Sequence, residues 1–169
     1  MAPKSYIVIN GPNPTTAAPT KIATGSATLK TLLQIKSPTT PIIRPVAWGI
    51  SFDAAAGAAG GTVELIETDV AATVTAYVAA DIQKYGDANA PTSSIVIGST
   101  TASGYTASVE GTITVTRYAD LQIVQPTAQY NQTWALDREF EMIPGRFLRV
   151  RTTFPATVNA LCYVVYQEG

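Results

Sequence analysis

Hydrophobic and polar residues alternate along much of this chain, and a period of two predicts strands rather than helices. Residues 29–36 begin this pattern: Leu29, Leu33 and Ile35 are expected to face a core, and Lys30, Gln34 and Lys36 to face water. Residues 46–52 alternate large with small side chains. This second pattern predicts a strand with one bulky face and one shallow face, as in a sheet that packs on another sheet.

Similar short segments recur to the end of the chain, and turn residues separate them. We expect strands over residues 62–67, 107–117, 121–124, 134–142, 147–154 and 158–166. Residues 68–85 can form either a helix capped by Thr68 or Asp69 or, as we expect, mostly strand and loop with one helical turn. About ten short strands at regular spacing predict an all-β, jelly-roll-like β-sandwich, with residues 21–169 as its single domain.

Residues 1–20 differ from the rest because they contain four prolines, which remove backbone donors. Residues 6–9 could form a short strand before residues 10–14 break it, but we expect no place for this segment in the interior of a sheet. It is either a frayed terminus or an extended N-terminal arm that becomes ordered on a partner, and we adopt the second interpretation. A second candidate contact is the long excursion predicted over residues 87–105. The candidate interface residues from the two segments are Tyr6, Ile7, Ile9, Pro12, Pro14 and Tyr105.

A row of carboxylates occupies residues 137, 139 and 141, where alternate positions of a strand share one face. A three-residue hairpin loop over residues 143–145 would set Asp137 opposite Arg151 and Glu139 opposite Arg149. A four-residue loop would shift the pairing by one residue and bring carboxylates onto the apolar face. We therefore predict a ladder of cross-strand ion pairs, in preference to a metal site or a glycosidase pair.

The same register places Arg138 among apolar neighbours, where a guanidinium needs a carboxylate, carbonyl groups or a subunit contact. We keep both interpretations, internal pairing and an interface residue. Cys162, the only cysteine, has apolar neighbours on both sides and is expected to be a buried small hydrophobe.

Composition narrows the function classes. The 169 residues include no histidine, and their formal net charge is −1. Without histidine or a second cysteine we expect no enzyme, no metal and no cofactor. The lack of a basic stripe argues against nucleic-acid binding, and no apolar run is long enough to predict a signal peptide or a membrane span.

Residues 144–151 and 155–162, together with residues 62–68, resemble the closing strands of small β-sandwich proteins from actinobacterial phages and their hosts. Related proteins of this size resemble capsid decoration, or cement, proteins. The resemblance implies a structural virion protein on the capsid surface, assembled in the host cytoplasm. It implies a homotrimer that binds the major capsid protein and reinforces capsomer contacts. No residue role can be transferred from it position by position.

A receptor- or carbohydrate-binding module of a phage tail is the alternative function. Such a module needs exposed aromatic rings in a shallow groove, and the candidates are Trp48, Tyr105, Tyr130 and Trp134. Trp48 alternates with core positions and is expected to be buried.

Overall fold

The computed structural model describes residues 4–55, 57–135 and 137–169. Its strands are β1 (Lys4–Ile9), β2 (Ile22–Ala23), β3 (Leu29–Lys36), β4 (Ile43–Phe52), β5 (Gly61–Thr68), β6 (Thr73–Ala76), β7 (Gln83–Lys84), β8 (Gly104–Val109), β9 (Thr116–Val124), β10 (Gln129–Thr133), β11 (Phe147–Thr153) and β12 (Asn159–Glu168). One 3₁₀ turn, η1 (Ala79–Asp81), lies between β6 and β7. The chain is all-β, as predicted.

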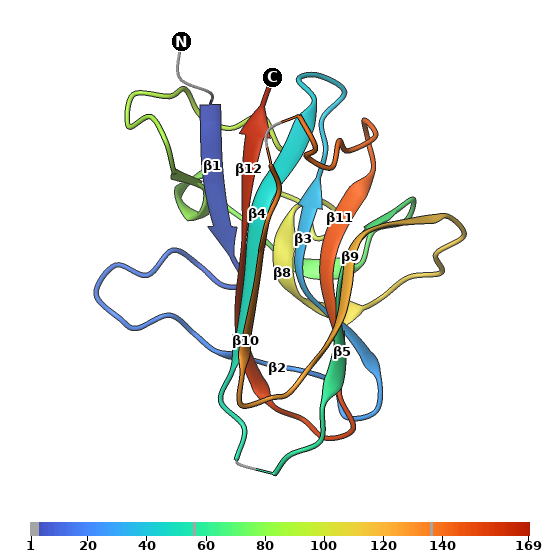
Figure 1. The fold of residues 1–169 in the computed structure, drawn as a ribbon. Helices are drawn as coiled ribbons and strands as arrows, with labels where there is room; N and C mark the ends of the chain where they lie inside the picture. Colours follow the sequence, from blue (N-terminus) through green and yellow to red (C-terminus); the bar gives the residue numbers. More distant parts are fainter. Residues whose placement is uncertain (1–3, 56, 136) are drawn as a thin grey trace.

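The strands form two antiparallel sheets (Figure 1). The first sheet has the order β10-β4-β12-β1-β7, and β2 pairs with β12 at its end. The second sheet has the order β6-β8-β3-β11-β5-β9. Two sheets around one core confirm the predicted sandwich, whereas the jelly-roll connectivity stays a prediction. None of the described helices is long and apolar enough to cross a membrane.

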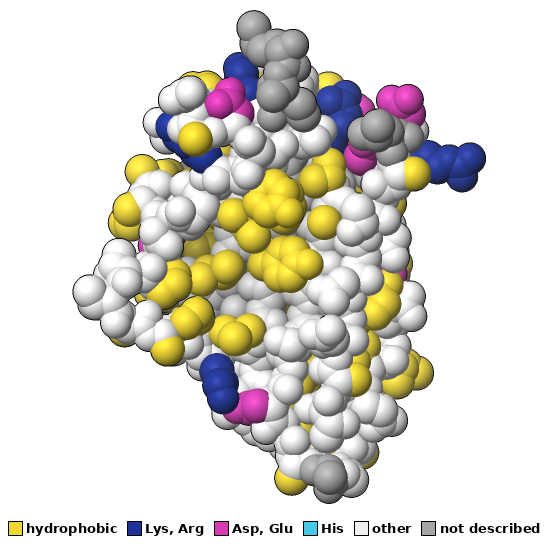
Figure 2. Space-filling view, turned by 60° about the vertical axis from the view of Figure 1, so that its left-hand side comes forward, with side chains coloured by type: hydrophobic (Ala, Val, Ile, Leu, Met, Phe, Trp, Pro, Cys, Tyr) yellow, Lys and Arg dark blue, Asp and Glu magenta, His cyan; other side chains and the backbone are white. Residues whose placement is uncertain are grey.

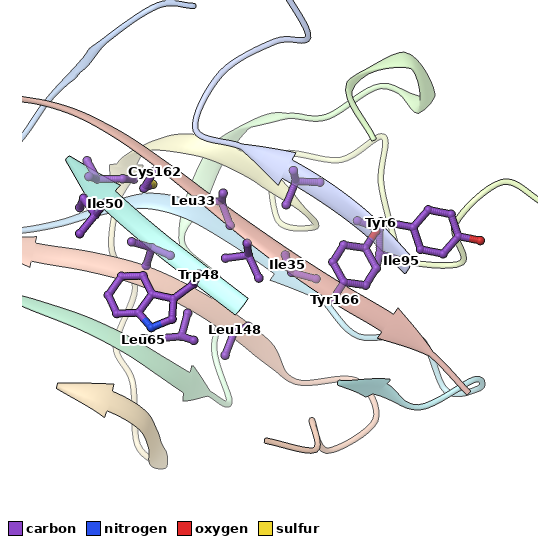
Figure 3. Packing of buried hydrophobic residues seen from close by; sticks show 14 of the residues in the cluster. Tyr6, Leu33, Ile35, Trp48, Ile50, Leu65, Ile95, Leu148, Cys162 and Tyr166 are labelled. Atoms are coloured by element: carbon purple, nitrogen blue, oxygen red, sulfur yellow. The ribbon is translucent and has the colours of Figure 1, made fainter. Parts of the chain in front are cut away.

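The core lies between the two sheets (Figure 3). The bulky face of β4 supplies Trp48 and Ile50, which meet Leu65 and Leu148 of the second sheet. Each such side chain contributes about 1.5–3 kcal/mol when it is fully buried. Burial of Trp48 and of Cys162 was expected, and both are in this cluster.

The N-terminal segment is only partly an arm. Residues 1–3 of the predicted arm lie outside the described residues, and β1 is a member of the first sheet between β12 and β7. The short strand considered for residues 6–9 is therefore present, whereas the prediction that this segment cannot join the interior of a sheet is wrong for β1. The physical reason is that Pro3 and Pro12 flank this strand without interrupting it, so its backbone donors remain available. Residues 11–20 form an exposed loop instead.

Two further strand predictions are wrong. Residues 107–117 were predicted as one strand, but β8 ends at Val109 and β9 begins at Thr116. Residues 134–142 contain no strand in their described part, and β10 precedes them. Residues 68–85 contain short strands and η1, as expected. The side chain of Gln34 is buried rather than solvated, because it accepts from the amide of Ala72 and donates to the carbonyl of Ala102.

Candidate functional site

The predicted ladder between the acidic row and β11 does not form. Strand β11 pairs with β3 on one side and with β5 on the other, so no edge is left for residues 137–142. Asp137 and Glu139 therefore do not pair with Arg151 and Arg149. The predicted pairs assumed that neighbouring segments of the chain form a hairpin, and two distant strands occupy those positions instead.

Arg149 is instead a buried anchor for two loops. Its side chain is 0% exposed, and it donates to the carbonyl oxygens of Glu110 (2.9 Å) and Val70. The Glu110 carboxylate lies 3.4 Å away and accepts from both the amide and the hydroxyl of Thr31. Burial lowers the pKa of Arg149 to about 10, and the nearby Glu110 acts in the opposite direction. This network holds the chain around residues 70 and 110 against the outside of the second sheet.

Four other charged side chains of the second sheet are also paired within the chain. Arg151 donates to Glu64 at 2.7 Å, and both side chains are buried. Arg117 makes two bonds to Glu67, at 3.0 and 3.2 Å, and its guanidinium lies 4.1 Å from the ring centre of Phe140. Among the described residues, no group of three or more acidic or cysteine side chains is arranged to hold a metal ion.

Two of the seven predicted interface residues pack in or against the core. Tyr6 is 1% exposed, stacks on Tyr166 at 5.6 Å and donates to the carbonyl of Pro91. Tyr105 is half-buried and packs on Tyr77 at 5.5 Å. Placing Tyr6 at an interface is therefore wrong, whereas an interface role for the half-buried Tyr105 stays a prediction. Both lie on strands that the prediction had treated as an arm or an excursion.

The other five predicted interface residues are accessible. Ile7 and Ile9 are half-buried on β1, while Pro12 and Pro14 are exposed on the loop that follows. Arg138 is exposed, so the prediction of apolar neighbours around it is wrong, because residues 137–142 are not a strand. Its side chain has no hydrogen bond or ion pair with any described residue. Whether any of the five contacts a partner remains a prediction.

The outer face of the first sheet carries an apolar hollow, which we call the β4–β12 hollow. Its volume is about 230 Å³. Figure 2 shows hydrophobic side chains gathered around the centre of this face. None of the lining residues is charged; they are Ile9, Asn10, Pro19, Gly49, Ile50, Ser51, Gln129, Asn131, Leu161, Cys162 and Tyr163.

Gly49 gives the hollow its shape. A Cβ at this position would lie 2.6 Å from Cε1 of Tyr163 and 2.2 Å from Oδ1 of Asn131. The Tyr163 ring therefore rests directly against the backbone of β4. Its hydroxyl donates to Oδ1 of Asn131 at 3.2 Å, which fixes the ring beside the β10 edge. Burial raises the pKa of the Cys162 thiol at the hollow's inner wall well above its usual range, which keeps it protonated near neutral pH.

A second apolar surface follows the edge strand β9; we call Tyr118, Leu121 and Ile123 the β9 strip. Their side chains are between half and four-fifths exposed, and Ile123 is the most exposed at 81%. Both charged residues of β9 are used internally, Arg117 as described and Asp120 by accepting from Trp48 and Tyr130. The strip therefore presents apolar side chains with no unpaired charge beside them.

Sequence reasoning identified neither surface, although one signal was available. The small residues of β4 predicted a shallow face, and the hollow lies on that face over Gly49. No comparable signal marked the β9 strip, because Leu121 and Ile123 have the same pattern as core residues. Comparison of the chain with protein-family models, curated proteins and solved structures finds no match.

Proposed function

We propose that the protein is a structural virion protein that binds the outside of an assembled phage capsid and reinforces the contacts between neighbouring capsomers. Its immediate partner would be the major capsid protein, and assembly would take place in the host cytoplasm. The resemblance noted in the sequence supports the choice of a tailed-phage capsid. The proposal needs a rigid body that can be held by more than one neighbour.

The observation that carries the proposal is the presence of two separate apolar surfaces on different sheets. The β4–β12 hollow lies on the first sheet and the β9 strip on the edge of the second, and both lack unpaired charge. Uncovered apolar surfaces of this kind are typical of protein–protein contacts. A body with two such surfaces can join two neighbours, which is the mechanical requirement of a cement protein.

Stabilisation of the shell would then follow from mass action. A protein that binds only the assembled shell shifts the equilibrium away from dissociated capsomers. Engaging the second surface after the first is an intramolecular step, so two weak contacts can give one strong attachment. No covalent chemistry and no cofactor are needed for this mechanism.

Cosedimentation tests the proposal. The protein is incubated with purified phage heads that lack it and, separately, with host cell walls. We expect it to pellet with the heads and to raise the temperature at which they release DNA. In an Ile123→Lys variant, head binding should fall at least tenfold. A Val78→Lys variant is the matched control, because Val78 is also a β-branched aliphatic residue, 60% exposed, outside both surfaces.

The alternative is a receptor- or carbohydrate-binding module of the phage tail, and the Tyr163 ring in the hollow favours it. A ring flanked by the Asn131 and Gln129 amides offers stacking and hydrogen bonding to a sugar. The aromatic candidates from the sequence do not line this hollow; Trp48 is buried and Trp134 is half-buried. Pelleting with cell walls and not with heads would establish this alternative and refute the capsid proposal.

A further inference from the structure

The rim of the β4–β12 hollow carries hydrogen-bond donors that no described residue accepts. The side-chain amide of Gln129 has no hydrogen bond within the described residues, and Asn131 uses only Oδ1, which accepts from Tyr163. Two amide NH₂ groups thus border an apolar floor that contains a tyrosine ring. This combination suits an uncharged extended peptide whose carbonyl groups accept and whose apolar side chains fill the hollow.

Proline is the residue type that already lies in this hollow. Pro19, near the end of the exposed loop of residues 11–20, is part of its lining. A proline-containing segment offers carbonyl acceptors while lacking some N–H donors, and its restricted φ lowers the entropy lost on binding. Such a segment matches a site that supplies donors and an aromatic surface.

The chain itself exposes one segment with this chemistry. Residues 11–20 carry no charge, and Pro12 and Pro14 are both exposed. The ends of the loop lie close together, since a Cβ on Gly11 would be 3.8 Å from the carbonyl oxygen of Thr20. The amide of Asn13 donates to Asp81 at 2.9 Å, which ties the loop to η1. Figure 1 shows this loop, between β1 and β2, extending sideways from the first sheet.

We propose that the β4–β12 hollow binds the loop of residues 11–20 from a second copy of this chain. Pro12 or Pro14 of one copy packs on Tyr163 of the next, and the Gln129 and Asn131 amides donate to carbonyl groups of the loop. Loop and hollow are different surfaces, so the contact is head-to-tail and a suitable rotation closes it into a ring. In this arrangement the hollow joins neighbouring copies of the chain, and the β9 strip stays available to the capsid protein of the proposed function; the contact itself can be measured on the isolated protein.

Charge favours a second copy over an unrelated partner. Neither the loop nor the hollow lining contains an acidic or basic side chain. Two copies therefore meet at this contact without like-charge repulsion and without an unpaired charge to desolvate. A charged partner segment would lose its hydration with no counter-charge in the hollow.

Measurement of the molar mass by sedimentation equilibrium tests the proposal. We expect the full chain to be a closed oligomer whose mass falls to that of the monomer in Tyr163→Ala and, separately, in Pro12→Ser/Pro14→Ser. Tyr85→Ala is the matched control, because Tyr85 is 63% exposed and is not part of the hollow; its mass should not change. Circular dichroism and thermal melting establish that each variant is folded.

Mixing the two defective variants gives the sharpest result. The Tyr163→Ala variant keeps an intact loop and the double proline variant keeps an intact hollow, so the mixture should form a one-to-one complex. A wild-type chain that stays monomeric up to millimolar concentration would refute the proposal. So would an oligomer that survives both changes, or a mixture that does not associate.

A synthetic peptide with the sequence of residues 11–20 provides an independent measurement. The peptide should bind the wild-type chain and, by competing for the hollow, dissociate the oligomer into monomers. It should bind the Tyr163→Ala variant at least tenfold more weakly. Peptide binding without any oligomer of the full chain would mean that the hollow serves a foreign proline-containing segment, and would overturn the assignment of a second copy.

Discussion

The outer faces of the two sheets differ in their charge and in how far the chain itself covers them. On the second sheet, the outer face carries Arg149 and Arg151, and the chain around residues 70 and 110 covers the former. On the first sheet, the outer face carries apolar and uncharged polar side chains around a hollow, and only the end of one loop reaches it. The second sheet is charged and covered by the chain itself around Arg149, while the first sheet is uncharged and open around its hollow.

This difference indicates whether each region is covered by the chain itself or by another molecule. A buried charge is tolerated only where its partners are held in fixed positions, as Glu110 and Val70 are by the same chain. An open face that is to bind another molecule avoids that requirement when it contains no charge. The contrast therefore supports a structural role for the part of the second sheet's outer face around Arg149 and a binding role for the hollow on the first sheet.

The largest effect is expected from Arg149→Ala. Removing this buried guanidinium leaves the carbonyl oxygens of Val70 and Glu110 without their donor and the Glu110 carboxylate without its counter-charge. Loss of one partner of a buried pair costs about 3–5 kcal/mol of unfolding free energy. Urea denaturation measures this change. Arg138→Ala is the control, and because Arg138 is exposed we expect a change within about 0.5 kcal/mol. Equal effects of the two changes would contradict the proposed contrast.

A smaller effect on stability is expected from Gly49→Ala. The added Cβ collides with the Tyr163 ring and the Asn131 side chain, both of which can move outward. The unfolding free energy should fall by about 1 kcal/mol, since the collision involves movable side chains. Self-association should nevertheless be lost, because the Tyr163 ring can no longer rest against the backbone of β4. Thermal melting and sedimentation together separate the two results, and retention of the oligomer would show that the hollow is not the contact.

The smallest effect on stability is expected from Asp69→Asn. Asp69 precedes Val70, whose carbonyl accepts from Arg149, and its carboxylate holds residues 114 and 115. Its carboxylate accepts from the Thr114 hydroxyl and from the amides of Thr114 and Val115, and these bonds lower its pKa from 3.8 to about 2. A lowered carboxyl pKa stabilises the fold above pH 3.8, and this contribution is lost as the pH falls through about 2. The stability difference between wild type and Asp69→Asn should therefore be constant above pH 4 and shrink below it. Equilibrium denaturation across this range measures it, and a difference independent of pH would rule out the carboxylate as its source.

Local pattern predicted some elements of this protein well. Residues 29–36, 62–67 and 147–154 were expected as strands, and β3, β5 and β11 occupy nearly the same positions. Burial of Trp48 and Cys162 followed from their apolar neighbours, and the shallow face of β4 followed from Gly49 and its small neighbours. These features depend on residues close together in the sequence, where alternation and side-chain volume carry the information.

Pairing between distant segments was not predictable in the same way. Glu139 and Arg149 have the spacing of a hairpin, yet β5 and β3 flank β11. Its arginines pair with Glu64 of β5 and with Glu110, which follows β8. The sequence predicted a solvated Gln34, because no residue near it in the chain indicates that Ala72 and Ala102 cover its side chain.

By itself, the sequence determined that this chain folds into strands, where many of them lie, and that its chemistry does not rely on histidine. Only the tertiary structure decided which face of each sheet is covered, which charges are paired, and that Ile9, Pro19 and Tyr163 border one hollow. The physical reason is that side-chain alternation fixes the two faces of a strand locally. The neighbours of each face come from the packing of the whole chain.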